Sequence, residues 1–204
     1  HSMINGTSEF VNQLAIAITT VVFNRSALLF AGEDGVAAVS IIMYLQFLCI
    51  GIYFGFSMGL STPLGYAYGD RNFSVCRVLE KYAYRFFAIA PIILYGCTYL
   101  LAPIGVRFFA SPDSTVFDMA VSGLRLYGLG FLFSGINIFA TIRMMTYGKG
   151  YISGMITFLR SFALLLLFLT VLPRFLELNG IWLAVPAAEI LTLIVALWTL
   201  RKKL

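Results

Sequence analysis

The sequence predicts an all-α integral membrane protein, a bundle of six transmembrane helices embedded in a lipid bilayer. Hydrophobic residues make up 60% of the 204 residues and charged residues only 11%, whereas a soluble domain carries about 25% charged residues. The apolar residues also form long uninterrupted runs, which is typical of chains whose solvent is lipid. Six spans and their short loops fill the chain, so we expect no separate soluble domain.

The first three spans are separated by polar turns. The first is expected at residues 7–30 and ends before the acidic turn around Glu33 and Asp34. The second, at 36–66, contains Gly51, Gly55 and Gly59, whose GxxxG spacing predicts close packing of another helix. Residues 69–81 form a polar connection that we expect to be a short surface helix carrying Cys76. The third span is expected at 82–104.

The last three spans end at glycine and proline residues. The fourth is expected at 117–147, where Gly148 and Gly150 interrupt the helix. The fifth covers 151–172 and ends at Pro173, and the sixth covers 179–200. Pro186 lies inside the sixth span and predicts a kink that frees backbone groups.

Residues 1–3 are expected to be the scar of a cleaved expression tag, which leaves residues 4–204 as a single transmembrane lobe. The rest of the chain has no histidine, which excludes imidazole catalysis and histidine metal sites. The three cysteines lack metal-ligand spacing. Because no nucleophile–base set is present, we expect no enzyme activity, cofactor, metal or nucleic-acid partner.

The basic residues gather at one end of the expected bundle. If there are six spans, both termini lie on the same side, and the positive-inside rule makes that side cytoplasmic. The protein is then a multi-pass protein of the inner (plasma) membrane. The eight cations on the expected cytoplasmic side are Arg71, Arg77, Lys81, Arg85, Lys149, Arg201, Lys202 and Lys203, against Arg107 and Arg174 opposite.

Polar residues inside two spans are candidates for an ion site. On the first span, Glu9, Gln13, Thr20 and Asn24 share one helical face, and a carboxylate with amides suits a proton or a hard cation. The alternative is that Glu9 only lies in a first turn near water, favoured by the helix dipole. On the fourth span, Asn137 either faces a cavity or hydrogen-bonds a neighbouring helix.

A buried ion pair is expected between Arg160 and Glu189. Their distances from the cytoplasmic ends of the last two spans place both about 14–16 Å deep, at 1.5 Å per residue. Consecutive antiparallel spans pack as neighbours, so the charges can meet where either one alone is costly. A structural role is favoured, and a proton relay through Glu189 is the alternative. Arg143, by contrast, is expected to snorkel to the membrane interface.

Several segments together resemble the multidrug and toxic compound extrusion (MATE) family, and specifically its C-terminal six-helix lobe. The match covers nearly the whole chain. The segments that carry the resemblance are Asn5–Phe10, Asn24–Arg25, Gly32–Ala38, Gly59–Gly69, Tyr147–Gly150, Leu159–Ser161, Asn179–Ala184 and Pro186–Glu189.

The resemblance implies a cation-coupled efflux transporter that works by alternating access, with an organic cation or drug-like substrate. It also implies that an N-terminal six-helix lobe is missing from this chain. In the family, an acidic residue placed like Glu9 can join the coupling-ion site. Asn137 stands where some branches have a second acidic residue, so the ion stays open between a proton and sodium. The alternatives are a lobe of a lipid-linked-sugar flippase and a small dimeric membrane carrier.

Overall fold

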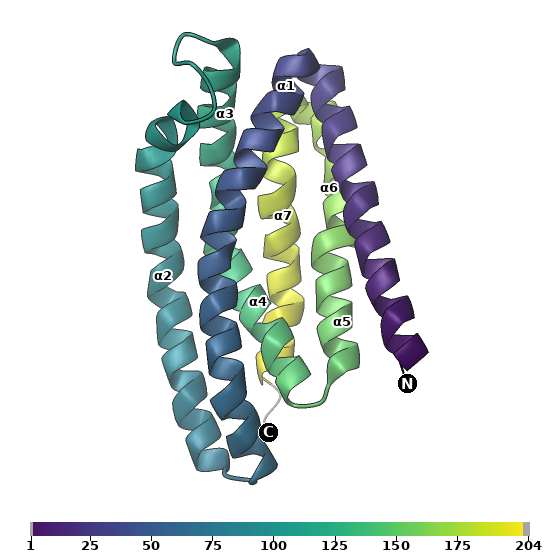
Figure 1. The fold of residues 1–204 in the computed structure, drawn as a ribbon, viewed down its shortest axis with the longest axis vertical. Helices are drawn as coiled ribbons and strands as arrows, with labels where there is room; N and C mark the ends of the chain where they lie inside the picture. Colours follow the sequence, from purple (N-terminus) through teal and green to yellow (C-terminus); the bar gives the residue numbers. More distant parts are fainter. Residues whose placement is uncertain (1, 202–204) are drawn as a thin grey trace.

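The computed structural model describes residues 2–201, and the side chains of residue 15 and residues 17–201. The described chain is a bundle of long helices running roughly along one axis (Figure 1). This confirms the all-helical prediction. The elements are α1 (Ser2–Gly69), α2 (Phe73–Arg107), α3 (Thr115–Tyr127), the 3₁₀ turn η1 (Gly128–Gly130), α4 (Phe131–Thr146), α5 (Gly150–Phe158), the π-helical turn η2 (Leu159–Ala163), α6 (Leu164–Val171) and α7 (Pro173–Arg201).

Five helical stretches of the described chain are long and apolar enough to cross a membrane, which makes it a multi-pass membrane protein. The predicted count of six is not settled by length and composition, because the first stretch runs unbroken over Ala17–Gly69. The other stretches are Phe73–Arg107, Thr115–Thr146, Gly150–Val171 and Pro173–Arg201.

α1 reverses direction at Gly32, so residues 2–31 and 33–69 form two limbs that meet at one end of the bundle (Figure 1). Gly32 has φ 63°, a left-handed conformation that favours glycine. A Cβ on Gly35 would lie 2.7 Å from the carbonyl oxygen of Ala27, so the second limb starts against the backbone of the first. The reversal therefore depends on two glycines in the segment predicted to be an acidic turn.

α2 begins much earlier than the sequence predicts. The expected surface helix over 69–81 is wrong: α1 continues to Gly69, a short turn follows, and α2 starts at Phe73. Asn72 caps α2, because its side chain accepts a hydrogen bond of 3.2 Å from the amide of Val75. Cys76 and Glu80 thus lie in the first two turns of a long helix, and both are buried.

The last three helical stretches are irregular. η1 separates α3 from α4, and the π-helical turn η2 separates α5 from α6. α7 is interrupted at Glu177, which has φ 50°, and it carries Pro186 in its interior. A Cβ on Gly180 would lie 2.5 Å from the backbone of Leu172, so only glycine fits this close approach to α6.

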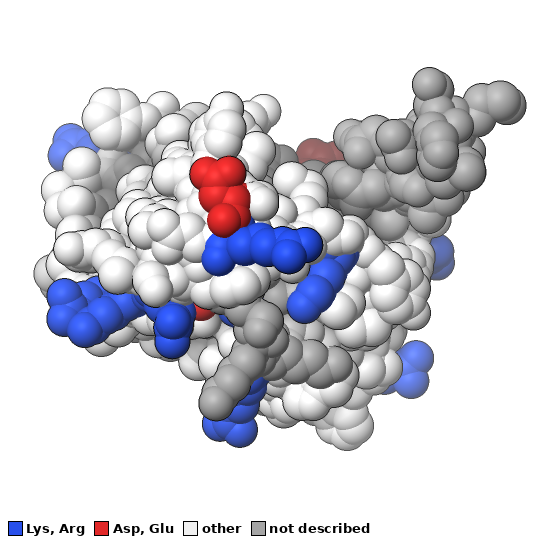
Figure 2. Space-filling model, turned by 90° about the horizontal axis from the view of Figure 1, so that it is seen from below, with Lys and Arg blue, Asp and Glu red and all other residues white. Residues whose placement is uncertain are grey.

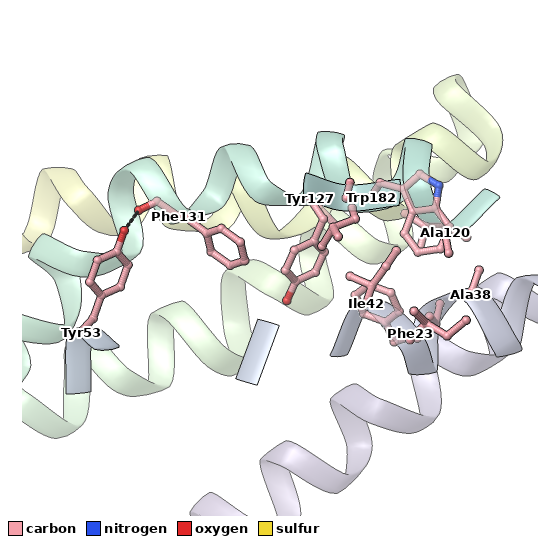
Figure 3. Close-up of a cluster of buried hydrophobic side chains, with 14 of the residues drawn as sticks. Phe23, Ala38, Ile42, Tyr53, Ala120, Tyr127, Phe131 and Trp182 are labelled. Atoms are coloured by element: carbon pink, nitrogen blue, oxygen red, sulfur yellow. Dashed lines mark hydrogen bonds between the residues drawn. The ribbon is translucent and has the colours of Figure 1, made fainter. Parts of the chain in front are cut away.

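The main hydrophobic core joins α1, α2, α3, α4, α6 and α7, and Figure 3 shows part of it. Trp182 of α7 packs where Gly123 of α3 leaves room, since a Cβ on Gly123 would lie 2.9 Å from the indole. The hydroxyl of Tyr53, in the second limb of α1, donates a 3.0 Å hydrogen bond to the carbonyl of Phe131, as Figure 3 shows. This bond ties α1 to the start of α4.

The outer surface of the helices is largely apolar. Large side chains such as Leu48 and Leu100 are mostly exposed, which suits contact with lipid. The expected packing on Gly51, Gly55 and Gly59 is not found: no described atom of another element lies within 4 Å of a Cβ built on any of them. The end that carries the α1–α2 and α4–α5 turns displays clustered Lys and Arg side chains (Figure 2).

We predict that Cys76 resists a water-soluble maleimide even after the membrane is opened. The thiol is fully buried against Leu64 and Tyr147, so reagent access requires local unfolding. Mass spectrometry of labelled protein measures the result. A cysteine introduced by Arg77→Cys, at the exposed next position, is the control and should react. Rapid labelling of Cys76 in the native protein would contradict the structure.

Candidate functional site

A polar cluster lies in the middle of the bundle, centred on the carboxylate of Glu189 in α7. Its side chain is 6% exposed. One oxygen, Oε1, lies 3.2 Å from Nη1 of Arg160, and the other accepts a 2.7 Å hydrogen bond from Nδ2 of Asn137. Both carboxylate oxygens are therefore engaged, which offsets the cost of placing a charge among apolar helices.

Asn137 joins α4 to α7 through a forked contact. Its Nδ2 also donates to the backbone carbonyl of Glu189, at 2.9 Å. The residue is completely buried, and its Oδ1 has no hydrogen-bond partner among the described residues. Of the two roles that the sequence left open, the structure shows the hydrogen bond to a neighbouring helix, and it leaves one amide oxygen unused.

Arg160 lies in the π-helical turn η2. A π-helical turn inside an α-helix is uncommon and is often found at functional sites. The carbonyl of Ser161 in this turn accepts a hydrogen bond of 3.3 Å from Oγ1 of Thr19, in the first limb of α1. The side chain of Arg160 is 16% exposed, so it is the more accessible partner of the Arg160–Glu189 pair.

A pocket of about 310 Å³ opens beside this pair. Both limbs of α1, the α3–α4 junction, η2, α6 and α7 all contribute to its wall. Tyr127 and Gln46 face each other there, because the tyrosine hydroxyl donates to Oε1 of the amide. Apolar and polar groups both line the pocket: Thr19, Thr20, Phe23, Met43, Gln46, Phe47, Ile50, Tyr127, Gly130, Phe131, Ser134, Arg160, Ser161, Leu165, Val185, Ala188 and Glu189.

A second buried ion pair connects α2 with α4. Nε of Arg143 contacts Oε1 of Glu80, and the hydroxyl of Tyr147 donates to the same oxygen at 2.6 Å. The prediction that Arg143 snorkels is wrong, since its side chain is 3% exposed. Sequence reasoning missed Glu80 because it assigned that residue to a surface connection. The available signal was the spacing of four positions between Cys76 and Glu80, which places both on one face of a helix.

The structure thus brings Asn137, Arg160 and Glu189 into one cluster, and Thr20, Tyr127 and Ser134 line the pocket beside it. The side chains of Glu9 and Gln13 lie outside the described residues. Gln46 was not singled out from the sequence, although it is the amide of an otherwise apolar stretch. Its partner Tyr127 comes from a helix 81 positions away, which no local pattern reveals.

Comparison with known proteins gives one family and several structures. The MatE family model matches residues 9–172. No curated protein matches the sequence. An outward-facing multidrug resistance MATE family transporter of the MOP superfamily is 23% identical, with a TM-score of 0.84, over 95% of this chain and 44% of that one.

Two further structures are similar. An inward-facing MATE family transporter of the same superfamily is 22% identical, with a TM-score of 0.86, over 95% of this chain and 45% of its own. The third structure is a MOP superfamily transporter from Pyrococcus furiosus Vc1 (DSM3638), described as having a binding pocket of reverse polarity. It is 22% identical, with a TM-score of 0.84, over 95% of this chain and 44% of its own. This chain therefore spans less than half the length of the structures that share its fold.

We predict strong coupling between Arg160 and Glu189 in the stability of the protein in detergent. Arg160→Met removes the cation of the buried pair, and Glu189→Gln removes its negative charge. Either change alone should lower the free energy of unfolding by about 3–5 kcal/mol, because it leaves the other residue without its charged partner. The double variant should cost less than the sum of the two. Chemical or thermal unfolding of the four proteins measures this. Simple additivity would show that the two residues do not interact.

Proposed function

This chain belongs to the MatE family, as its sequence motifs predicted, and on that premise we propose that it forms the C-terminal lobe of a cation-coupled multidrug efflux transporter. Both limbs of α1 cross the membrane in this proposal, which gives six spans. An N-terminal lobe of six more spans completes the transporter. The observation that carries the proposal is a pocket with a buried ion pair at the centre of an apolar bundle, because ionisable groups at such depth mark transport pathways.

Alternating access is the mechanism that the fold supports best. The same lobe resembles both an outward-facing and an inward-facing transporter to a similar degree. A lobe that keeps its fold in both states moves as a rigid body, and rocking of one lobe against the other exposes a fixed central site to either side. The breaks at η1, η2 and Pro186 place irregular backbone around the pocket rather than against lipid, as such a site requires.

The coupling ion, a proton or sodium, is proposed to bind between the first limb of α1 and α4. Glu9 supplies the carboxylate and Gln13 an amide on the same helical face. Asn137 supplies an oxygen, since its buried Oδ1 has no partner among the described residues. Carboxylate and amide oxygens are suitable ligands for a hard cation. The transported compound is proposed to be an organic cation or another drug-like molecule.

A flippase for lipid-linked sugars is less well supported. Such a protein is expected to line its cavity with several cations, to bind phosphate. Among the described residues at this pocket the cation is Arg160, and it is already paired with Glu189. An enzyme is not supported either, because the matching family is one of transporters.

We predict that Glu9→Gln in the full-length protein lowers ion-driven efflux of ethidium by about tenfold or more, because the variant keeps the side-chain shape but loses the titratable charge. Efflux is measured in membrane vesicles with an imposed proton or sodium gradient. Glu33→Gln, an exposed acidic residue in the α1 turn, is the matched control and should export normally. Efflux and ion dependence equal to the wild type in Glu9→Gln would remove Glu9 from the mechanism.

We also predict that the α4–α5 turn is cytoplasmic. In a background without native cysteines, Lys149→Cys should react with an impermeant maleimide only after cells are opened. Asp113→Cys, in the exposed loop at the opposite end, should react in intact cells. Both positions are exposed, so access depends on the side of the membrane and not on burial. The reverse pattern would invert the orientation.

A further inference from the structure

The two charges at the central pocket are not equally available to a ligand. Glu189 has both carboxylate oxygens and its backbone carbonyl in hydrogen bonds with Arg160 and Asn137. Arg160 uses Nη1 for Glu189, and this is its one hydrogen bond among the described residues. A guanidinium has five N–H donors, so most of its donor capacity remains unused at the wall of the pocket. Of the two charged side chains, Arg160 is therefore the one with hydrogen-bonding groups available to a ligand.

A second polar group in the same wall lacks a partner. Ser134 of α4 lines the pocket, is 1% exposed, and its hydroxyl has no hydrogen-bond partner in the described part of the chain. A buried hydroxyl without a partner is destabilising, and such groups are uncommon in folded proteins. Since a hydroxyl can donate to a carboxylate as well as accept, the missing partner is consistent with an acceptor group on a ligand.

Much of the remaining wall is apolar, although polar side chains such as Thr19, Gln46 and Ser161 also line it. Phe23, Phe47 and Phe131 line it, together with Met43, Ile50 and Leu165. Its volume of about 310 Å³ lies at the lower end of the range in which small-molecule sites are found, about 300–1,000 Å³. An inorganic ion would leave this apolar surface unfilled, whereas a flat ring system would cover it. The pocket thus favours a compact amphiphile.

We propose that this pocket binds an aromatic organic carboxylate, with the carboxylate on the free donors of Arg160 and the hydroxyl of Ser134, and with the ring among the phenylalanines. Arginine is well suited to this task because its planar fork matches a carboxylate in two parallel hydrogen bonds. A cation would have to displace Arg160 from Glu189 and leave the guanidinium buried without its partner. This site is additional to the proposed ion site and to the site of a transported organic cation, and it does not depend on the direction or energy source of transport.

The test uses the full-length protein that carries this sequence, in lipid nanodiscs at pH 7. The probes are 2-naphthoate, neutral 2-naphthamide and cationic 2-naphthylmethylamine, which share one ring system and differ in charge. Equilibrium dialysis with radiolabelled probes measures binding, and empty nanodiscs correct for partition into lipid. We expect saturable binding of naphthoate, about tenfold or more tighter than either of the other two, as one charge-assisted contact requires.

Four variants locate the site. The double variant Arg160→Met with Glu189→Gln removes the guanidinium without stranding a charge, and it should lower naphthoate affinity by about tenfold or more. Ile50→Phe fills the pocket while keeping the ion pair, and it should have a similar effect. Ser134→Ala should weaken binding by a few-fold. The control is Arg143→Met with Glu80→Gln, which removes the other buried pair and should leave naphthoate affinity unchanged.

Three results would overturn the proposal: no saturable binding of naphthoate, tighter binding of the amine, or unchanged affinity in Ile50→Phe. If the double variant does not fold, Ile50→Phe and Ser134→Ala decide the question, because both keep the Arg160–Glu189 pair.

Ethidium efflux is measured on the same variants. Naphthoate binding without efflux would contradict the proposed transport function alone, and efflux without naphthoate binding would contradict this inference alone.

Discussion

The structure depends on the rule that a charge inside a bilayer must be paired within the protein. Two ion pairs satisfy it in the described chain, and each joins two different helical stretches: Glu80 with Arg143, and Arg160 with Glu189. The first pair connects α2 to α4 near the basic end of the bundle. The second connects η2 to α7 at its centre. Helices whose outer faces all meet lipid gain little hydrophobic preference for one neighbour over another, so these polar contacts help to fix which helices pack together.

Interruptions in the helices position the central pair. α1 reverses direction at Gly32, so both of its limbs border the pocket, and η1 and the start of α4 contribute Gly130 and Phe131 to the wall. The π-helical turn carries Arg160, and Pro186 lies one turn before Glu189. Regular helices would place the same side chains on smooth apolar surfaces. The breaks open the space that the pocket occupies, and the surrounding helices keep the freed backbone groups away from lipid.

The fold class and part of the site could be predicted from the sequence. Long apolar runs identify membrane helices because lipid imposes one physical requirement, and equal depth brought Arg160 and Glu189 together in the prediction without knowledge of the helix packing. The extent of α1 and α2 could not be predicted, since the polar residues from Gly69 to Lys81 look like a loop when their partners are unknown. Glu80 is tolerated in a helix only because Arg143, 63 positions away, neutralises it.

The uncovered face of Gly51, Gly55 and Gly59 is a second feature that local sequence did not predict correctly. A spacing that permits close helix contact does not specify that a contact forms within this chain. The structure leaves these glycines uncovered by the residues that it describes. The GxxxG spacing therefore indicates where another helix could pack closely. Whether one does pack there depends on the three-dimensional arrangement of the helices.

The position of Glu189 also has a consequence for how the protein is made. The chain is synthesised from its N-terminus, so Arg160 leaves the ribosome first and its carboxylate partner follows 29 residues later. Until α7 enters the bilayer, the guanidinium must remain at the water interface or in the insertion machinery, because no partner yet exists for it. Insertion of α7 thus allows the preceding helix to reach its final depth.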